Sequence, residues 1–266
     1  MIECNQNPPL VQDLAQLLNQ SRDPVDIKRL MNHEPGLEEW ELPLVDLCGL
    51  SSENEEERVS CASEICKASS ELGFFQIVNH GISLDLLRNM RKEQVKLFKV
   101  PFEQKTSSGL LDNSYRWGNR TATCPKQLSW CEAFHVPLSK ISDHTCYGEF
   151  NSLREVMQEY ANAMQELAKS IAGVLVANMG AQRGGWEDNC NASTCFMRLN
   201  RYPPCPISPE LFGLVPHTDS DFLTILHQDE HVGGLQLMKD SKWVAVKPNP
   251  DALVVNIGDL FQVYFL

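Results

Sequence analysis

The stretch Gly213–Leu226 reads G-L-V-P-H-T-D-S-D-F-L-T-I-L, and it places a histidine and a carboxylate two residues apart, at His217 and Asp219. Side chains alternate along an extended segment, so residues i and i+2 point to the same face. The polar run Thr218–Asp221 is typical of a strand end or loop, and Phe222–Leu226 has the β-branched and aromatic content of the strand that follows. We therefore expect the imidazole and the carboxylate to lie side by side.

An imidazole and a carboxylate in this arrangement supply two of the three protein ligands of a 2-His-1-carboxylate site, which holds non-haem Fe(II) on one face. The H-x-D pair alone is a weak signal, and its setting at a strand end gives it weight. The third ligand would be a histidine from a later strand, but no histidine follows His231. Asp221 shares the parity of Asp219; we disfavour it as a ligand because neighbouring carboxylates repel each other.

The composition of the 266 residues is that of an ordinary globular protein, with 42% hydrophobic and 22% charged residues. The formal net charge of −12 argues against binding to nucleic acid or to an anionic membrane surface. The ten cysteines include no C-x-x-C pair, which excludes the usual zinc-ribbon and thioredoxin patterns. The N-terminal sequence lacks the basic and apolar regions of a secretory signal peptide, so we expect a cytoplasmic protein with free thiols.

Three segments have apolar side chains at the three- and four-residue spacing of amphipathic helices, namely Glu55–Leu72, Leu84–Val100 and Phe150–Met179. Short strands are expected at Trp40–Leu47, Phe74–Asn79, Leu128–Leu138, Cys195–Tyr202, Phe222–His227, Leu235–Met238, Trp243–Val246 and Leu253–Ile257. The last apolar run, Leu260–Leu266, is expected to be a further strand, and Arg116–Asn119 a loop.

Helices early in the chain and short strands at regular intervals later predict an α+β protein in which helices buttress a β-sandwich or barrel. We divide the chain into an N-terminal extension (1–39), an N-terminal region (40–148), a long supporting helix with a linker (149–184) and a β-rich domain (185–266).

Four separated motifs occur in order along the chain: G-F-F-Q-I-V-N-H-G (Gly73–Gly81), N-R-Y-P-P-C-P (Asn200–Pro206), H-T-D (His217–Asp219) and G-G-L-Q-L (Gly233–Leu237). With them the sequence resembles the plant 2-oxoglutarate/Fe(II)-dependent dioxygenases from about Trp40 to Gln262. Two more segments, Tyr115–Thr123 and Leu128–Leu138, are similar to the gibberellin 2-beta-dioxygenases, particularly the subgroup that acts on C20 gibberellins.

This resemblance implies a double-stranded β-helix, or jelly roll, with Fe(II) held by His217 and Asp219. Tyr202 matches the family tyrosine that helps to bind 2-oxoglutarate, and Asn200 matches the asparagine beside it. The implied reaction uses O2 and 2-oxoglutarate, with ascorbate as reductant, to hydroxylate a gibberellin at C2 and so inactivate the hormone. The acidic net charge argues against a nucleic-acid or a membrane partner, and the sequence leaves the oligomeric state open.

The sequence departs from the family pattern after Gln262, because no residue matches the second iron histidine or the arginine that pairs with 2-oxoglutarate. We therefore expect a jelly roll without its last strands and impaired activity of this chain. Two alternatives remain open. One is a non-catalytic isoform or an incomplete gene model, and the other is a related dioxygenase that acts on a different plant metabolite.

Six further residues have side chains that could take part in a site. His80 lies in a turn, and we expect it to be structural. His135 could line a pocket or pack in the core. Arg116 and Trp117 could bind an acidic diterpenoid, with the arginine pairing with its carboxylate, although loop packing is the simpler role for the tryptophan. His227, like His231, is expected to be solvated.

Overall fold

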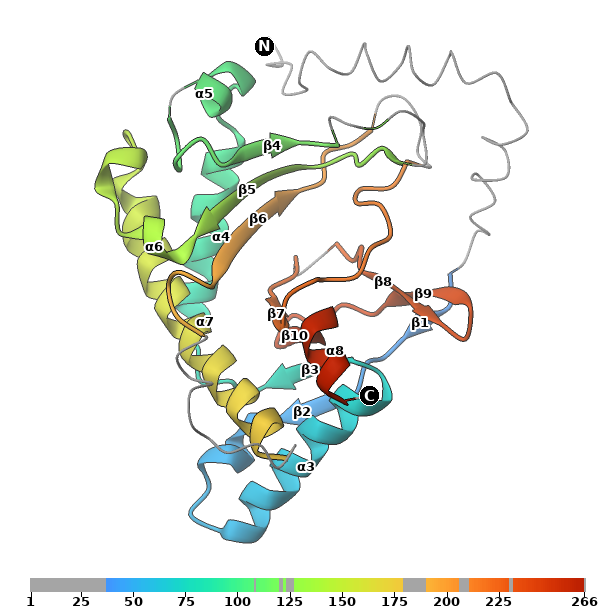
Figure 1. Ribbon diagram of the computed structural model, residues 1–266. Coiled ribbons are helices and arrows are strands. Elements are labelled where there is room, and N and C mark those ends of the chain that lie inside the picture. Colours follow the sequence, from blue (N-terminus) through green and yellow to red (C-terminus); the bar gives the residue numbers. More distant parts are fainter. Residues whose placement is uncertain are drawn as a thin grey trace, which may run out of the picture. The chain divides into compact units, whose positions relative to one another are not determined.

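The computed structural model describes residues 37–107, 109–119, 122, 127–178, 190–205, 211–229 and 232–265 (Figure 1). These residues form two compact units. Unit 1 is built from segments within Leu84–Asn162 and Ala192–Pro216, and unit 2 from segments within Glu34–Ser83, Ala163–Asn191 and His217–Leu266. The expected N-terminal extension lies almost wholly outside the described residues, and the four-part division of the chain stays a prediction.

Unit 1 contains an antiparallel sheet of three strands in the order β4–β5–β6. The strands are β4 (Tyr115–Trp117), β5 (Glu132–Pro137) and β6 (Phe196–Arg201). The helices of this unit are α4 (Leu84–Phe98), α5 (Phe102–Ser107), α6 (Leu138–Ile141), the 3-10 turn η3 (His144–Cys146) and the first half of α7 (Asn151–Asn178). Alternation along the strands turns Phe134, Val136 and Leu199 inward, where they share a core with Leu153 and Met157 of α7.

Unit 2 contains two sheets. One has the order β2 (Leu44–Asp46), β3 (Phe74–Val78), β10 (Leu253–Ile257) and β7 (Leu223–Leu226). The other has the order β1 (Glu39–Trp40), β9 (Lys242–Val246) and β8 (Gln236–Lys239). The central strand β10 runs antiparallel to both of its neighbours, so a strand near the end of the chain joins an early strand to the strand that follows His217.

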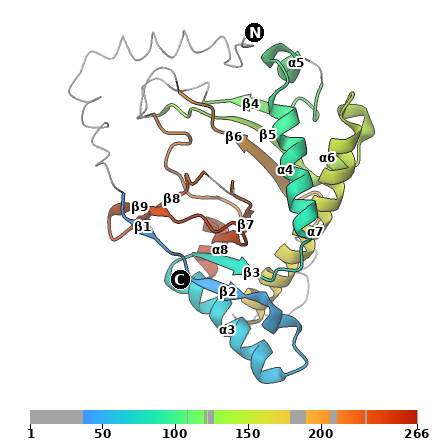
Figure 2. The ribbon, with the colours of Figure 1, turned by 180° about the vertical axis from the view of Figure 1, so that it is seen from behind.

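The helix α3 (Glu55–Glu71) lies alongside β2 and β3 in both views (Figures 1 and 2). It begins at Asn54, whose side chain accepts a hydrogen bond of 2.9 Å from the backbone N–H of Glu56. Three glutamates in its first turn add a favourable interaction with the helix dipole. Ile65 is fully buried from the other face of α3, in the same core as Phe75 of β3.

The segments with apolar residues at three- and four-residue spacing form the helices that we expect. The helices α3, α4 and α7 begin and end within two residues of the predicted bounds. Among the described residues, no helix is both long and apolar enough to cross a bilayer.

The expected final strand is wrong, because Asp259–Phe265 forms the helix α8. The backbone N–H of Gln262 donates a hydrogen bond of 3.0 Å to the carbonyl of Gly258, as in a helix. Phe261 is 1% exposed and packs edge-on against Phe222, whereas Val263 is 76% exposed. In a strand these two positions would share a face, so the helical turn is what buries one and exposes the other.

Two further expectations are wrong in detail. The single strand expected at Trp40–Leu47 is two strands, β1 and β2, interrupted at Pro43, which has no N–H for a sheet ladder. The loop expected at Arg116–Asn119 begins as the strand β4, because Tyr115 and Trp117 pair with Phe134 and Glu132 of β5. This pairing partner is distant in sequence and leaves no local signal.

Candidate metal-binding pair and the residues around it

His217 and Asp219 lie immediately before β7 in unit 2, with their side chains together as the alternation predicts. His217 Nε2 and Asp219 Oδ1 are 3.4 Å apart. Half of the His217 side chain and 30% of the Asp219 side chain are exposed. The pair is therefore open on one side, as a site that must admit a ligand requires.

The two oxygens of Asp219 have different surroundings. Oδ2 accepts a hydrogen bond of 2.7 Å from the hydroxyl of Thr224 and one of 2.8 Å from the side-chain amide of Asn256. Thr224 and Asn256 are register partners on β7 and β10, so the sheet itself holds both donors in place. The other oxygen, Oδ1, is the one that faces His217.

The loop that carries the pair is also clamped through its backbone. The N–H of Asp259 donates to the carbonyl of Asp219 at 2.7 Å, and the Asp259 carboxylate accepts from the Thr218 hydroxyl at 2.8 Å. Gly258 lies so close that an added Cβ would be 1.8 Å from the carbonyl oxygen of Asp221. The β10–α8 junction therefore determines the position of the pair, and only glycine fits at residue 258.

The geometry of the pair suits one metal ion. Two ligand atoms about 2.1 Å from the same ion are separated by about 3.0 Å at a right angle and about 3.4 Å at a tetrahedral angle. The 3.4 Å between His217 Nε2 and Asp219 Oδ1 falls in this range. In the described part of the chain, no group of three or more His, Cys, Asp or Glu side chains could hold a metal, so Asp221 does not complete the pair.

Asn200 and Tyr202 belong to unit 1, at the end of β6. The Asn200 side-chain oxygen accepts a hydrogen bond of 2.9 Å from Arg198 Nε, and its backbone carbonyl accepts one of 3.0 Å from Gln94. Tyr202 is 53% exposed, and its ring lies against Gly213, where a Cβ would be 2.7 Å from the ring. Partial desolvation nevertheless raises the pKa of the Tyr202 phenol, with the positive charge of Arg198 opposing the shift. The phenol is thus a neutral hydrogen-bond donor.

A buried ionic cluster lies next to this strand end. Glu132 on β5 is 1% exposed, and it pairs with Lys105 of α5 and with Arg201 of β6, the latter at 2.6 Å. The Tyr115 hydroxyl donates to the same carboxylate at 2.7 Å. Burial lowers the pKa of Lys105, an effect that the Glu132 carboxylate opposes, and burial next to this carboxylate raises the pKa of Tyr115. The cluster ties three elements to residue 201, between Asn200 and Tyr202.

The remaining candidates from the sequence have local roles. His80 Nδ1 accepts a hydrogen bond of 3.2 Å from the backbone of Ile82, which is a structural contact in a turn. Trp117 is buried and packs edge-on against Trp130 in the unit 1 core. His227 is partly buried just after β7.

His135 is exposed and stacks on Phe196 with a centroid distance of 4.2 Å. The Arg116 guanidinium donates to the backbone carbonyls of Asn113 and Tyr115. His231 lies outside the described residues.

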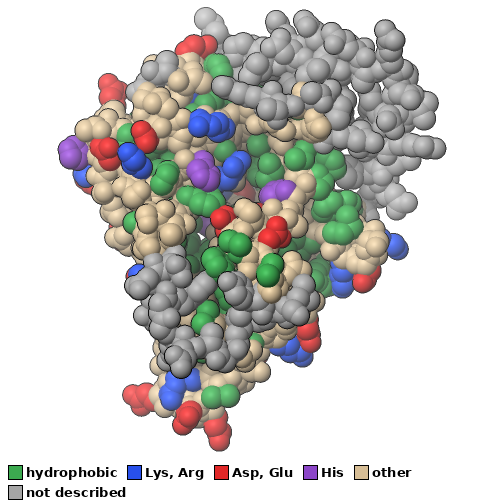
Figure 3. Space-filling model, in the orientation of Figure 1, with side chains coloured by type: hydrophobic (Ala, Val, Ile, Leu, Met, Phe, Trp, Pro, Cys, Tyr) green, Lys and Arg blue, Asp and Glu red, His purple; other side chains and the backbone are tan. Residues whose placement is uncertain are grey.

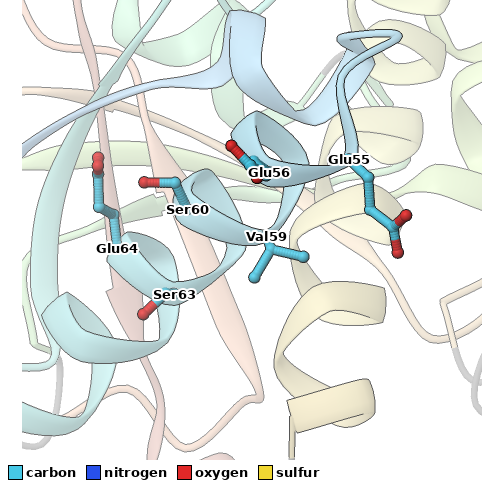
Figure 4. A pocket seen from close by; sticks show the side chains of 6 residues that line it. All are labelled: Glu55, Glu56, Val59, Ser60, Ser63 and Glu64. Carbon is cyan, nitrogen blue, oxygen red and sulfur yellow. The ribbon is translucent and has the colours of Figure 1, made fainter.

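A shallow depression on unit 2 offers no competing site. It is lined only by α3 side chains, which are Glu55, Glu56, Val59, Ser60, Ser63 and Glu64 (Figure 4). These side chains lie along the outer face of a single helix, and the depression contains no histidine or cysteine. We assign no chemistry to it.

The sequence pattern identified the pair, but it missed the residues that hold the pair. Thr224 and Asn256 are ordinary members of strands, and their role depends on the pairing of β7 with β10. The sequence gives a weak indication of Gly258 and Asp259, because Gly-Asp after a buried strand is typical of a tight turn.

Comparison with known proteins shows which family this chain matches. Residues 193–265 match the 2OG-Fe(II) oxygenase superfamily, and residues 42–164 match the N-terminal region described as non-haem dioxygenase in morphine synthesis. The gibberellin 2-beta-dioxygenase 6 of Oryza sativa subsp. japonica is 55% identical over 85% of this chain, and the alignment spans 65% of that relative. The gibberellin 2-beta-dioxygenase 5 of the same organism is 44% identical over 98% of this chain and 75% of its own length.

The fold agrees with these relatives. A crystal structure of JOX2 in complex with 2OG, Fe and JA matches this chain with a TM-score of 0.69 and 29% sequence identity. The match covers 97% of this chain and 75% of the JOX2 chain. Its family has a double-stranded β-helix fold, so the expected helix-buttressed jelly roll is confirmed. The chain therefore belongs to the 2-oxoglutarate- and Fe(II)-dependent oxygenases, with plant gibberellin 2-beta-dioxygenases among its relatives.

Proposed function

We propose that this chain is a dioxygenase that couples the oxidative decarboxylation of 2-oxoglutarate to hydroxylation of a gibberellin at C2, which inactivates the hormone. The observation that carries the proposal is the His217–Asp219 pair, whose facing donor atoms are 3.4 Å apart. Relatives with the name gibberellin 2-beta-dioxygenase support the substrate class. The chain spans about two thirds of the length of these relatives, between 65% and 75%.

In this proposal two pairs of residues have different roles. His217 Nε2 and Asp219 Oδ1 bind Fe(II), which supplies the oxidising chemistry when bound together with 2-oxoglutarate and O2. Thr224 and Asn256 hold the outer oxygen of Asp219, so that this carboxylate binds through one defined atom. Removing a hydrogen bond that orients a metal ligand commonly lowers the metal affinity about 10–100-fold.

Asn200 and Tyr202 bind 2-oxoglutarate. The neutral Tyr202 phenol donates a hydrogen bond to a carboxylate of the co-substrate, which is a charge-assisted and hence strong contact. The Asn200 side-chain oxygen is already occupied by Arg198, so its amide N–H groups are the atoms offered to a ligand.

The assay combines the full 266-residue chain with Fe(II), ascorbate, 2-oxoglutarate and either a C19 or a C20 gibberellin, and mass spectrometry follows the gibberellin and succinate. We expect a gibberellin hydroxylated at C2 that depends on 2-oxoglutarate and is lost in D219A. The impaired turnover expected from the sequence, the preference for C20 substrates and the cytoplasmic location stay predictions.

Two outcomes would reject the proposal. Turnover of flavonoids or alkaloids without turnover of gibberellins would assign the chain to another plant metabolite. Gibberellin binding without metal binding and without product would support the non-catalytic alternative.

A further inference from the structure

The segment Ser129–Glu132, here called the anchor segment, is buried and contains polar groups to which the proposed function gives no role. Its four residues are between 1% and 6% exposed. Burying a hydroxyl, an indole N–H or a carboxylate is unfavourable unless each group finds a hydrogen-bond partner. In this segment the partners of all three groups belong to the chain around Tyr202.

Two contacts of the anchor segment hold the chain on both sides of Tyr202. Arg201 Nη1 donates to the Glu132 carboxylate at 2.6 Å. The indole Nε1 of Trp130 donates to the carbonyl of Pro204 at 3.3 Å. Arg201 directly precedes the tyrosine, and Pro204 follows it by two residues. The backbone that carries the phenol is therefore held before and after it.

The surface on which the Tyr202 ring rests is held by the same segment. A Cβ added at Gly213 would be 2.7 Å from the ring, so the ring lies directly on this glycine. The backbone N–H of Trp130 donates at 2.8 Å to the carbonyl of the residue before Gly213. The Ser129 hydroxyl accepts a hydrogen bond of 3.2 Å from the N–H of Val215, two residues after this glycine.

Tyr202 itself is open to solvent, with 53% of the residue exposed. The outer face of the adjoining sheet is open as well, and Figure 3 shows a histidine and basic side chains next to one another over β5 and β6. A side chain that is mobile before it binds a ligand loses conformational freedom on binding, which weakens the affinity. Contacts that orient the phenol in advance therefore strengthen binding.

We propose that the anchor segment positions the Tyr202 phenol for 2-oxoglutarate, with Ser129 and Trp130 as positioning residues. The inference rests on the proposed function, in which this phenol donates to a carboxylate of the co-substrate. Ser129 and Trp130 do not touch the co-substrate and act through the chain around the tyrosine. Their contribution to 2-oxoglutarate binding should therefore exist only while residue 202 has its hydroxyl.

The experiment measures 2-oxoglutarate binding by anaerobic calorimetric titration of the full chain loaded with Co(II). S129A and W130F each remove one hydrogen bond to the chain around Tyr202 and keep most of the side-chain shape. We expect each to weaken 2-oxoglutarate binding roughly threefold to tenfold, the range for one hydrogen bond, and to leave the Co(II) affinity unchanged. Added to Y202F, the same substitutions should have no further effect, because changes that act through one shared group are not additive.

Two other buried residues of unit 1 supply matched controls. Within the described part of the chain, neither Ser114 Oγ nor Trp117 Nε1 has a hydrogen-bond partner, although both atoms are buried. S114A and W117F therefore make the same chemical changes without removing a hydrogen bond, and both should bind 2-oxoglutarate like wild type.

R88M is a general control, because Arg88 is an exposed arginine of α4 that pairs with Asp85. It should bind Co(II) and 2-oxoglutarate like wild type. Should W130F not fold, as judged by its thermal melting, S129A and its control carry the same comparison.

The proposal would be overturned if S129A and W130F weakened 2-oxoglutarate binding as much with Y202F as without it. Wild-type binding in both variants, or an equal loss in S114A and W117F, would also overturn it. A wild-type chain that binds no 2-oxoglutarate, or a Y202F chain that binds it as tightly as wild type, would instead reject the proposed role of Tyr202 itself. The two claims therefore fail in different ways.

Discussion

At the scale of single residues, Asp219 is defined by what its two oxygens contact. Thr224 and Asn256 saturate Oδ2, and His217 faces Oδ1. A carboxylate that was free to rotate would present either oxygen, so the two hydrogen bonds orient it before any metal binds. The sequence predicts the ligand pair but not this support.

Replacing Thr224 by valine removes one of these hydrogen bonds and keeps the shape of the side chain. We expect T224V to lower the affinity for Fe(II) or Co(II) about 10–100-fold, as measured by spectroscopic metal titration. T106V is the control, since the Thr106 hydroxyl donates its hydrogen bonds to backbone carbonyls of α5, at Phe102 and Glu103. Unchanged metal affinity in T224V would show that Asp219 needs no such support.

Glu132 is a buried charge with three partners, so losing it leaves Lys105 without its counter-ion in a buried place. Removing one partner of a buried ion pair typically costs about 3–5 kcal/mol. We expect E132Q to lower the free energy of unfolding by this amount in urea denaturation. The double variant E132Q/K105M removes both charges and should recover part of the loss. An E132Q protein as stable as wild type would contradict this role.

Asp46 gives stability a dependence on pH. The backbone N–H of Cys48 and the side chain of Asn79, each at 2.9 Å, lower the pKa of its carboxyl. The unfolded chain therefore binds the proton more readily, and the contribution is present above the unfolded pKa of about 3.9 and lost as pH falls through the folded pKa. The stability difference between wild type and D46N should shrink below about pH 4 in urea denaturation. A difference that is constant from pH 7 to pH 3 would exclude this contribution.

At the scale of elements, local sequence predicts what local forces determine. Periodic apolar side chains identified α3, α4 and α7, because each of these helices buries one face. The strand β4 and the helix α8 were missed for a different reason. β4 exists through its pairing with β5, and α8 through the burial of Phe261, and both depend on partners distant in the sequence.

The junction of β10 and α8 is the element on which the metal-binding pair depends most. At Gly258 an added Cβ would collide with the Asp221 carbonyl, 1.8 Å away. We expect G258A to lower stability by about 1–3 kcal/mol and to weaken metal binding, since the loop must move. G173A is the opposite case, because Gly173 is in α7 with open space around it.

At Gly173 an added methyl group fits, and alanine favours a helix over glycine by about 1 kcal/mol. Thermal melting should therefore show G173A above wild type and G258A below it. G258A with wild-type melting and metal affinity would show that the β10–α8 junction does not determine the loop.

At the scale of the whole molecule, the motifs identified the family, while the long-range pairings had to come from the structure. The motifs could be read without a fold because each one is local. The order β2–β3–β10–β7 unites strands from both ends of the chain, and no local pattern predicts it. This order brings Asn256 to Asp219, so the topology of unit 2 and the support of the metal-binding pair have the same cause.

The most direct test is an anaerobic Co(II) titration of the full chain in the presence of 2-oxoglutarate, followed by visible absorption. Wild type should bind a single equivalent, D219A and H217A should each lose at least about tenfold in affinity, and R88M should match wild type. A wild-type chain that binds no metal, or D219A and H217A variants that bind it as tightly as wild type does, would contradict the assignment of His217 and Asp219 as the metal-binding pair.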